Sequence, residues 1–169
     1  MLIFSLLHDL HARSIDFTLA FPQADVDTTI YMELPRGVET VNGKDEVFLI
    51  LKNLYGLKQA SKTWFEHLRD GLTSKELGFT PSAVDPCVFY KDGCAILCYV
   101  DDCLIFARTK AMADKVLSDL QSYGYVLTDE GEVTNYLGVQ VDHDPENGSF
   151  TLSQPYLVER ILALLGDAV

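Results

Sequence analysis

The most constraining feature of this sequence is a pair of aspartates between two apolar runs. The runs cover residues 95–100 and 103–107, and only Asp101 and Asp102 separate them. Such runs predict two buried strands joined by a tight turn. Tight hairpin turns favour Asn-Gly or Asp-Gly, because their central residues need positive φ. An Asp-Asp pair is therefore a poor choice for turn geometry alone.

Two adjacent carboxylates also have an electrostatic cost. Their repulsion raises the pKa of one of them or demands a cation. A hard divalent ion such as Mg²⁺ answers that demand, because it takes carboxylate oxygens and keeps waters and phosphates as further ligands. The alternative is a solvated polar turn in which water screens the repulsion. Turn chemistry alone leaves both interpretations open.

A third carboxylate, Asp16, stands at the end of another short apolar run, just before an irregular segment. A carboxylate at a strand end often faces a cleft, although a helix or loop cap is the alternative. Phosphoryl transfer from a nucleoside triphosphate uses two metal ions about 3.5–4 Å apart, one at the attacking hydroxyl and one at the leaving pyrophosphate. Carboxylates from neighbouring strands can bridge such a pair, so Asp16, Asp101 and Asp102 form a candidate two-metal site.

Composition and charge limit what the chain can do alone. Its 169 residues correspond to one domain, and 48% hydrophobic residues suffice for a packed core. The net charge of −12 argues against a free-standing nucleic-acid binder, because phosphate contacts need Lys and Arg. Residues 52–75 nevertheless hold five basic residues against two acids. A surface that grips a nucleic-acid backbone is therefore predicted near this segment.

Apolar periodicity and turn signals predict an α+β fold of helices interleaved with antiparallel hairpins. Helices are expected over about residues 2–11, 58–77 and 110–123 and again from Pro155, with Gly78 capping the second helix. Residues 21–29 read as irregular. The Asp92-Gly93 pair is a strong hairpin signal. Strands are expected near residues 14–19, 30–34, 46–51, 87–90, 95–100, 103–107, 136–141 and 149–152.

The cysteines and histidines carry no metal-site pattern. Cys87, Cys94, Cys98 and Cys103 lack a C-x-x-C spacing and lie in apolar sequence, which predicts buried reduced thiols in a cytosolic or nuclear protein. His8 and His11 are assigned to a helix surface. No apolar run approaches the roughly 20 residues that span a bilayer, and the start of the chain lacks a signal-peptide pattern. A secreted or membrane protein is therefore not expected.

Six ordered blocks resemble one known family. Residues 99–102 resemble the Tyr-x-Asp-Asp signature of reverse transcriptases, and the surrounding sequence is similar to that of copia-type LTR retrotransposons. The resemblance covers nearly the whole chain. The blocks are DFTLAF (16–21), IYMELPRG (30–37), LYGLKQA (54–60, with Trp64 following), YVDD (99–102), YLGV (136–139) and LSQPY (152–156).

This resemblance implies a fold and an activity. The fold would be a reverse-transcriptase palm over residues 1–169, an antiparallel sheet with helices packed on one face, truncated fingers, and a truncated thumb starting at about residue 153. The activity would be RNA-directed DNA polymerisation by two-metal nucleotidyl transfer within a Pol polyprotein. The partners would be a primer on an RNA or DNA template and deoxynucleoside triphosphates. The location would be a cytoplasmic virus-like particle or the nucleus.

The resemblance also implies roles for single residues. Asp16 and Asp101 would hold two Mg²⁺ ions, for which Mn²⁺ is an alternative, with Asp102 beside them and the backbone carbonyl of Phe17 on one metal. Phe21 would be a steric gate against a ribose 2′-hydroxyl, with a core phenylalanine as the alternative. The remaining nucleotide-binding residues would be Phe17, Gly56, Leu57, Lys58, Gln59 and Tyr99. The primer grip would be Tyr136, Leu137 and Gly138, where the glycine would allow close backbone approach.

Some positions depart from the family pattern. Thr128 stands where a lysine is expected, and that lysine is a candidate general acid for pyrophosphate. The chain also begins 15 residues before Asp16 and ends within the expected first thumb helix. The isolated chain is therefore expected to bind primer and template poorly and to be inactive alone. The competing hypothesis is a catalytically silent remnant that acts at most as a binding module. An unrelated metal-dependent phosphohydrolase would require the six blocks to match by chance.

Overall fold

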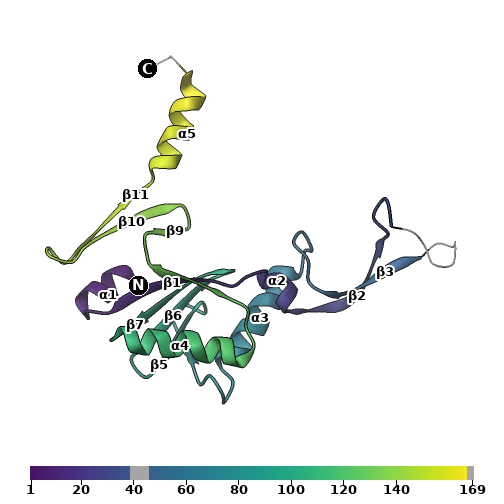
Figure 1. Ribbon diagram of the computed structural model, residues 1–169, viewed down its shortest axis with the longest axis horizontal. Helices are drawn as coiled ribbons and strands as arrows, with labels where there is room; N and C mark the ends of the chain where they lie inside the picture. Colours follow the sequence, from purple (N-terminus) through teal and green to yellow (C-terminus); the bar gives the residue numbers. More distant parts are fainter. Residues whose placement is uncertain (39–45, 167–169) are drawn as a thin grey trace.

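The computed structural model describes residues 1–38 and 46–166 (Figure 1). Its helices are α1 (Leu2–Leu7), α2 (Ala20–Gln23), α3 (Ala60–Leu72), α4 (Lys110–Tyr123) and α5 (Pro155–Leu165). Its strands are β1 (His11–Asp16), β2 (Asp25–Glu33), β3 (Val47–Lys52), β4 (Thr80–Pro81), β5 (Val88–Lys91), β6 (Cys94–Tyr99), β7 (Asp102–Ala107), β8 (Thr128–Glu132), β9 (Asn135–Tyr136), β10 (Val139–Asp144) and β11 (Ser149–Ser153). The predicted mixture of helices and antiparallel hairpins is confirmed.

Within the described residues the strands form three sheets. The main sheet has six strands in the order β4-β5-β6-β7-β1-β8, and its neighbours are antiparallel. Strands β6, β7 and β1 form its centre. Residues 103–107 are all buried. Their unbroken apolar run follows from this place, because a central strand covered on both faces has no solvent side.

The two faces of the main sheet have different covers. Ile15, Ile96 and Ile105 face α3 and α4 in one core cluster. The second cluster, on the other face, holds Leu104 and Phe106 and packs against α1 and the small sheet of β9, β10 and β11. The two long helices thus share one face, as predicted, but α1 lies against the opposite face. The prediction that helices pack on one face is therefore wrong for α1.

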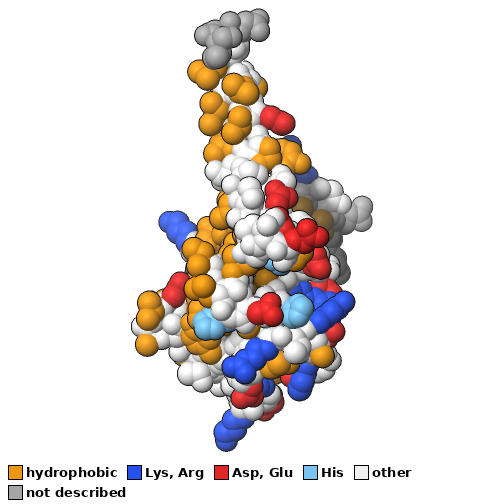
Figure 2. All heavy atoms as spheres, turned by 90° about the vertical axis from the view of Figure 1, so that its left-hand side faces the viewer, with side chains coloured by type: hydrophobic (Ala, Val, Ile, Leu, Met, Phe, Trp, Pro, Cys, Tyr) orange, Lys and Arg blue, Asp and Glu red, His pale blue; other side chains and the backbone are white. Residues whose placement is uncertain are grey.

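Two elements project from this body (Figure 1). The hairpin of β2 and β3 extends to one side, and α5 extends from the end of β11. No residue of α5 is buried. Figure 2 shows apolar side chains standing out along the projecting helix. Leu164, for example, is 86% exposed.

Several predicted boundaries are wrong near the N-terminus. The helix predicted over residues 2–11 ends at Leu7. Asp9 takes φ 50°, a left-handed conformation that stops a helix, and the chain enters β1 at His11. His11 therefore lies on a strand, not on a helix surface. Residues 21–29, predicted to be irregular, contain the end of α2 and the start of β2.

Helix α3 is shorter than predicted. It covers Ala60–Leu72 where 58–77 was expected, and Thr73 caps it. Gly78 has φ 69° but lies six residues after the helix ends, so its predicted role as the helix cap is wrong. The backbone N–H of Gly78 instead donates to the Ser74 carbonyl at 2.7 Å. The positive φ serves the turn that leads to β4.

The other turn predictions are confirmed. Asp92 and Gly93 join β5 to β6 with φ values of 46° and 79°, the pattern of a type I′ turn. Helix α5 begins with Pro155 in its first turn. Strands β10 and β11 pair around residues 145–148. Of the four thiols, three are buried as predicted and Cys87 is half-buried.

A glycine in α3 allows the chain after α4 to approach closely. A β-carbon added at Gly71 would stand 1.9 Å from the hydroxyl oxygen of Tyr125. That hydroxyl donates to the His67 carbonyl at 3.1 Å, and the ring of Tyr125 is buried against Phe17 and Trp64. The burial raises the pKa of Tyr125, so the phenol stays protonated and can donate. The absence of a side chain at Gly71 thus lets Tyr125 lock onto α3.

We expect Gly71→Ala to destabilise the fold by about 3 kcal/mol, at the upper end of the cost of overpacking a core. The sign is opposite to helix propensity, which favours Ala over Gly by about 1 kcal/mol. Urea unfolding measures the change. Ser61→Ala, at an exposed position of the same helix, is the matched control and should be close to neutral. Unchanged stability in Gly71→Ala would contradict this packing.

Candidate active site at the β6–β7 turn

The turn that carries the acidic pair is displaced by one residue from its predicted position. Tyr99 ends β6 and pairs with Asp102, the first residue of β7. The two turn residues are therefore Val100 and Asp101. Val100 has φ 57°. A β-branched residue in this conformation is an outlier with a cost of roughly 1–3 kcal/mol.

Two hydrogen bonds from neighbouring elements hold this strained turn. The indole Nε1 of Trp64, on α3, donates to the Val100 carbonyl at 2.7 Å. The backbone N–H of Phe17 donates to the Asp101 carbonyl at 3.0 Å. Both rings are buried, and they pack edge to face with centroids 5.3 Å apart. The core of the protein thus fixes the backbone of the acidic turn.

The three predicted acids meet at this end of the sheet. Asp16 is the register partner of Asp102 across β1 and β7. Side chains at such positions leave the same face, with β-carbons about 4.5–5.5 Å apart. Asp101 precedes Asp102 in the turn. Burial and then the charge of Asp101 raise the pKa values of both Asp16 and Asp102.

A fourth acid, Glu130, belongs to the same cluster. The β1–β8 register shifts between Ser14, which pairs with Gly131, and Ile15, which pairs with Asp129. Glu130 is the extra residue of this bulge. Its carboxylate accepts a hydrogen bond from the Ser14 hydroxyl at 2.7 Å, and its charge helps raise the pKa values of Asp16 and Asp102. Bulges often redirect a side chain beside a functional site.

Sequence reasoning missed Glu130 because β8 was not predicted. The segment Thr128–Glu132 is polar and acidic and has little strand propensity. Pairing with β1 imposes the strand. Arg13 on β1 supports it, since its guanidinium binds Asp129 on β8 through Nε at 2.7 Å and also contacts Asp114 on α4. These partners raise the pKa of Arg13, and the guanidinium lowers the pKa of Asp129.

Thr128, which stands where the family pattern has a lysine, lies directly beside the acids. Thr128 is the register partner of Asp16 on the β8 side, opposite Asp102 on the β7 side. Its hydroxyl lies 3.2 Å from that of Thr18. Position 128 is therefore adjacent to Asp16 in space, which the sequence alone did not show.

The predicted gate residue lies next to this cluster. Phe21, on α2, packs against Tyr55 with ring centroids 4.6 Å apart and the ring planes tilted by 49°. Burial raises the pKa of Tyr55, and the carboxylates of Asp101 and Asp16 raise it further. The structure thus brings Phe21 and Tyr55 together with the acids, and sequence reasoning did not single out Tyr55.

The other predicted nucleotide-binding residues form the approach to α3. The sequence predicts a helix from about Lys58, but the helix begins at Ala60, so residues 56–59 all lie in the segment that precedes it. Gly56 has φ 96°, and Gln59 caps the helix with its backbone. Leu57 is half-buried and Lys58 exposed. Tyr99 is 58% exposed at the end of β6.

The predicted primer-grip residues form a tight turn on the acidic face of the main sheet. Tyr136 pairs with Val139, and the two central residues, Leu137 and Gly138, have φ 52° and 78°. Tyr136 packs against the second core cluster, and burial raises its pKa. A β-carbon at Gly138 would meet nothing within 4 Å. The positive φ of Gly138 therefore serves the backbone conformation of the turn, and close approach of this backbone to a primer stays a prediction.

The acidic cluster fits a hard cation by its chemistry. Carboxylate oxygens are the ligands that Mg²⁺ and Mn²⁺ prefer. Burial is the first cause of the raised pKa values of Asp16 and Asp102, and the charges of Asp101 and Glu130 add to it, so a cation between these acids would relieve part of their repulsion. No three acid, histidine or cysteine side chains within residues 1–38 and 46–166 are grouped closely enough to enclose a metal ion. The carboxylates are thus suitable ligands for Mg²⁺ or Mn²⁺ by their chemistry. Their side chains are not arranged around a single point in this structure.

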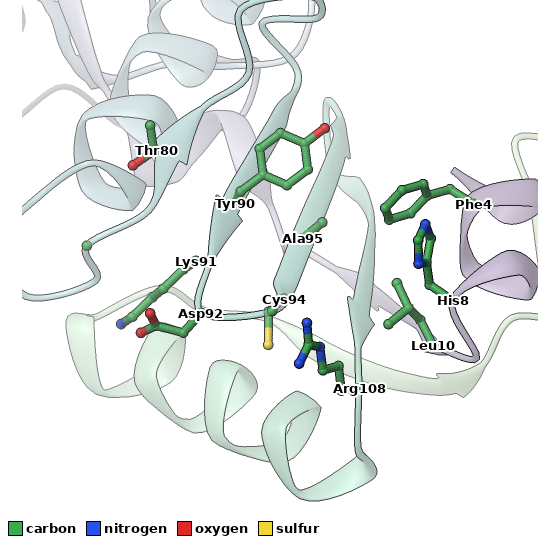
Figure 3. Close-up of a pocket in the computed structure, with 12 residues that line it drawn as sticks. Phe4, His8, Leu10, Thr80, Tyr90, Lys91, Asp92, Cys94, Ala95 and Arg108 are labelled. Atoms are coloured by element: carbon green, nitrogen blue, oxygen red, sulfur yellow. The ribbon is translucent and has the colours of Figure 1, made fainter.

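A cavity lies away from these acids. It has a volume of about 660 Å³ and opens between α1 and the β5–β6 hairpin, with Phe4 and His8 on one side and Tyr90 on the other (Figure 3). Cys94 lines it, and Cys94 is the first residue of β6, whereas the acidic turn follows the last. The acids are therefore at the opposite end of the strand from this cavity.

Comparison with known proteins assigns the family. The reverse transcriptase (RNA-dependent DNA polymerase) family matches residues 1–166. The chain therefore belongs to this family, and the predicted resemblance to the copia type is confirmed by relatives named as transposon Pol polyproteins.

Three relatives illustrate the similarity. The chain is 34% identical to the retrovirus-related Pol polyprotein from transposon TNT 1-94 of Nicotiana tabacum, over 91% of its own length and 12% of the relative's. It is 33% identical to the putative transposon Ty5-1 protein of Saccharomyces cerevisiae, over 86% and 47%. It is 31% identical to the retrovirus-related Pol polyprotein from transposon RE1 of Arabidopsis thaliana, over 79% and 9%. The chain thus spans less than half the length of each of these relatives.

The helices give no indication of a membrane span. In the part of the chain that the structure describes, none combines the length and the hydropathy needed to cross a bilayer.

We expect Val100→Gly to stabilise the fold by about 1 kcal/mol. Relief of roughly 1–3 kcal/mol of strain exceeds the roughly 0.5–1 kcal/mol that a glycine costs in the unfolded chain. Chemical denaturation measures the difference. Val84→Gly is the control, because Val84 is exposed and has no positive φ, so only the cost should appear. A loss of stability at position 100 equal to that at position 84 would show that the turn is not strained.

Asp16→Asn should raise stability at neutral pH by roughly 0.5–1 kcal/mol, the size of interactions between partly solvated charges. The native pKa of Asp16 lies above its unfolded value, so its charge opposes folding above that pKa. Below it the wild-type carboxyl is protonated and the penalty disappears. The advantage of the variant should therefore shrink as pH falls, and thermal melts across that range measure it. If the stability advantage of Asp16→Asn grew as the pH fell, the pKa of Asp16 would be lowered in the folded protein and not raised.

Proposed function

We propose that this chain is the palm core of an RNA-directed DNA polymerase of a copia-type retrotransposon, acting by two-metal nucleotidyl transfer. The observation that carries the proposal is the register that sets Asp16 opposite Asp102, with Asp101 in the adjacent turn. Membership of the reverse transcriptase family gives this acidic cluster its chemical meaning. The substrates would be deoxynucleoside triphosphates and a primer paired with an RNA or DNA template.

The residues of this chain would hold and orient the reactants. Asp16 and Asp101 would be the main metal ligands, with Asp102 beside them and the Phe17 carbonyl on one ion. When bound, Mg²⁺ would activate the 3′-hydroxyl and neutralise charge on the pyrophosphate. The hydrogen bonds from Trp64 and Phe17 to the turn would keep the acids in place without reorganisation during the reaction.

The contacting rings of Phe21 and Tyr55 beside the acids would shape the nucleotide site. Phe21 packs against Tyr55, which fixes the position of its ring. A fixed ring beside the sugar would exclude a 2′-hydroxyl by contact, whereas a mobile ring would not. The charges of Asp101 and Asp16 act on Tyr55, so its hydroxyl lies close enough to the acids to sense a bound cation. Tyr55 is thus a second residue expected to affect nucleotide selection.

The projecting elements would extend the palm. The β2–β3 hairpin would be the part of the fingers that this chain contains, and α5 the start of a thumb. The Tyr136-Leu137-Gly138 turn would grip the primer from the acidic face of the sheet. Residues 1–169 would then form one palm unit with partial fingers and thumb.

The basic segment offers less charge to phosphates than its sequence suggests. Lys52 pairs with Asp25 at 2.7 Å, Arg69 with Asp70 at 2.7 Å and Lys62 with Glu66 at 3.9 Å. These exposed pairs are weak and can be exchanged for phosphate, but each exchange leaves an acid behind. We therefore propose that tight binding of primer and template needs further parts of a longer polyprotein.

The second candidate function is a catalytically silent binding module, and Thr128 favours it. Its hydroxyl stands beside Asp16, where a lysine would neutralise charge and donate a proton. With Thr128, no cationic side chain of residues 1–38 or 46–166 is the register partner of any of the four acids on β7 or β8. Without such a donor, the metal site would survive but turnover would be slow. Metal binding and polymerisation must therefore be tested separately.

Metal binding tests the acidic cluster directly. We expect Mn²⁺ to bind the chain in calorimetric titrations and the affinity to fall at least about tenfold in Asp101→Asn. The affinity should also weaken as pH falls through the raised pKa values of Asp16 and Asp102, because protons then compete with the metal. Asp27→Asn, at an exposed acid on β2, is the matched control and should bind like the wild type. Equal affinities in all three proteins would refute a metal site at the turn.

Primer extension then separates the two functions. We expect a longer polyprotein that contains this chain to extend a primer on an RNA template with deoxynucleotides, and Asp101→Asn to reduce the rate by more than about 100-fold. Metal binding without any extension by the longer protein would favour the silent module. Extension that persists in Asp101→Asn would reject the proposed catalytic role.

A further inference from the structure

A second cavity borders the acidic turn and opens to the surface, since Ser61, Tyr99 and Val100 in its lining are exposed. It has a volume of about 220 Å³ and lies between α3 and the end of β6. Trp64 and Val100, which are joined by the hydrogen bond that supports the turn, both line it. Its walls also include Ser61, Leu68, Cys87 and Cys98.

The walls of this cavity define the chemistry of an occupant. No Lys, Arg, Asp, Glu or His is among the described residues that line it. The indole N–H of Trp64 is already used by the Val100 carbonyl, and the thiols are weak hydrogen-bonding groups. The hydroxyls of Ser61 and Tyr99 are the other polar side-chain groups of the lining. A charged ligand would therefore lose hydration without an opposite charge to compensate. An uncharged, largely apolar molecule would not.

The volume limits the size of the occupant. An engineered apolar cavity of roughly 150 Å³ binds benzene. A cavity of about 220 Å³ therefore accepts one aromatic ring with a substituent, or two fused rings. It is too small for a helix or strand of a protein partner. The thiols of Cys87 and Cys98 are polarisable and suit contact with an aromatic ring or a halogen.

We propose that this cavity binds a small uncharged aromatic molecule and that its occupancy acts on the acidic turn through Trp64. The indole is both a wall of the cavity and the donor that holds Val100 at φ 57°. A ligand that shifts the indole weakens that hydrogen bond. The strained turn then relaxes and moves Asp101 away from Asp16. The coupling depends on the geometry of the turn and does not require the chain to be an active polymerase.

Fluorescence quenching by bromobenzene tests the binding site. Trp64 is the single tryptophan of the chain, so its emission reports on this cavity alone. A bromine atom in contact with the indole quenches it. We expect quenching that saturates with bromobenzene concentration. Quenching that rises linearly without saturation would mean collision from solvent and would overturn the proposal.

Two substitutions on α3 locate the binding. Ser61 and Lys62 are both exposed, but only Ser61 lines the cavity. Ser61→Phe should fill the cavity and weaken the apparent affinity for bromobenzene at least about tenfold, and Lys62→Phe should leave it unchanged. Circular dichroism confirms that each variant is folded. Saturable quenching with equal affinity in both variants would place the ligand elsewhere and reject this site.

One further readout tests occupancy and a second tests the coupling. Bromobenzene should slow the alkylation of Cys87 by N-ethylmaleimide, because Cys87 lines the cavity and is half-buried, whereas the other three thiols are buried. It should also shift the amide resonances of Phe17 and Asp101 in wild-type protein but not in Ser61→Phe. Binding without any shift of these amides would overturn the coupling to the turn. Failure of metal binding or of primer extension would not affect either readout.

Discussion

Strands β1 and β7 pair antiparallel along their whole length, and this pairing sorts their side chains onto two faces. Ile15 and Cys103 point to the helices, while Asp16 and Asp102 emerge beside each other on the opposite face. Burying a side chain such as Ile15 contributes about 1.5–3 kcal/mol. Repulsion between the partly solvated acids costs less, roughly 1 kcal/mol or below. The burial of the apolar face therefore outweighs the repulsion, and the pairing of β1 and β7 keeps Asp16 and Asp102 close despite their like charge.

The turn beyond this pairing shows the same balance. Val100 is forced to positive φ, and the indole of Trp64 and the amide of Phe17 compensate from the core. Local strain and clustered like charge, both maintained by surrounding structure, are typical of functional sites. The bulge that turns Glu130 toward Ser14 adds to the pattern. The strain at Val100 and the repulsion between the acids thus lower the stability of this end of the sheet, and they accompany a fixed acidic cluster.

Prediction from sequence succeeded where a local signal was strong. The Asp92-Gly93 turn, Pro155 at the start of α5 and the apolar strands β6 and β7 carry their own propensities. It failed where tertiary contacts override them. β8 is acidic and becomes a strand only because β1 offers an edge and Arg13 binds Asp129. Helix α3 ends at Leu72, five residues before its predicted end at residue 77, because the chain turns there toward β4 and the Leu72 carbonyl accepts from the Phe79 N–H.

The sequence by itself determined that the chain has an apolar core, that its acids lie at strand ends, and that these acids follow the order of a reverse transcriptase. Those properties depend on residue type and spacing, which are local. Only the tertiary structure decided that Asp16 faces Asp102, that Thr128 and Glu130 join them, and that Trp64 supports the turn. These are register relations and contacts between residues tens of positions apart. One residue of slip between two strands would move every such side chain to the other face.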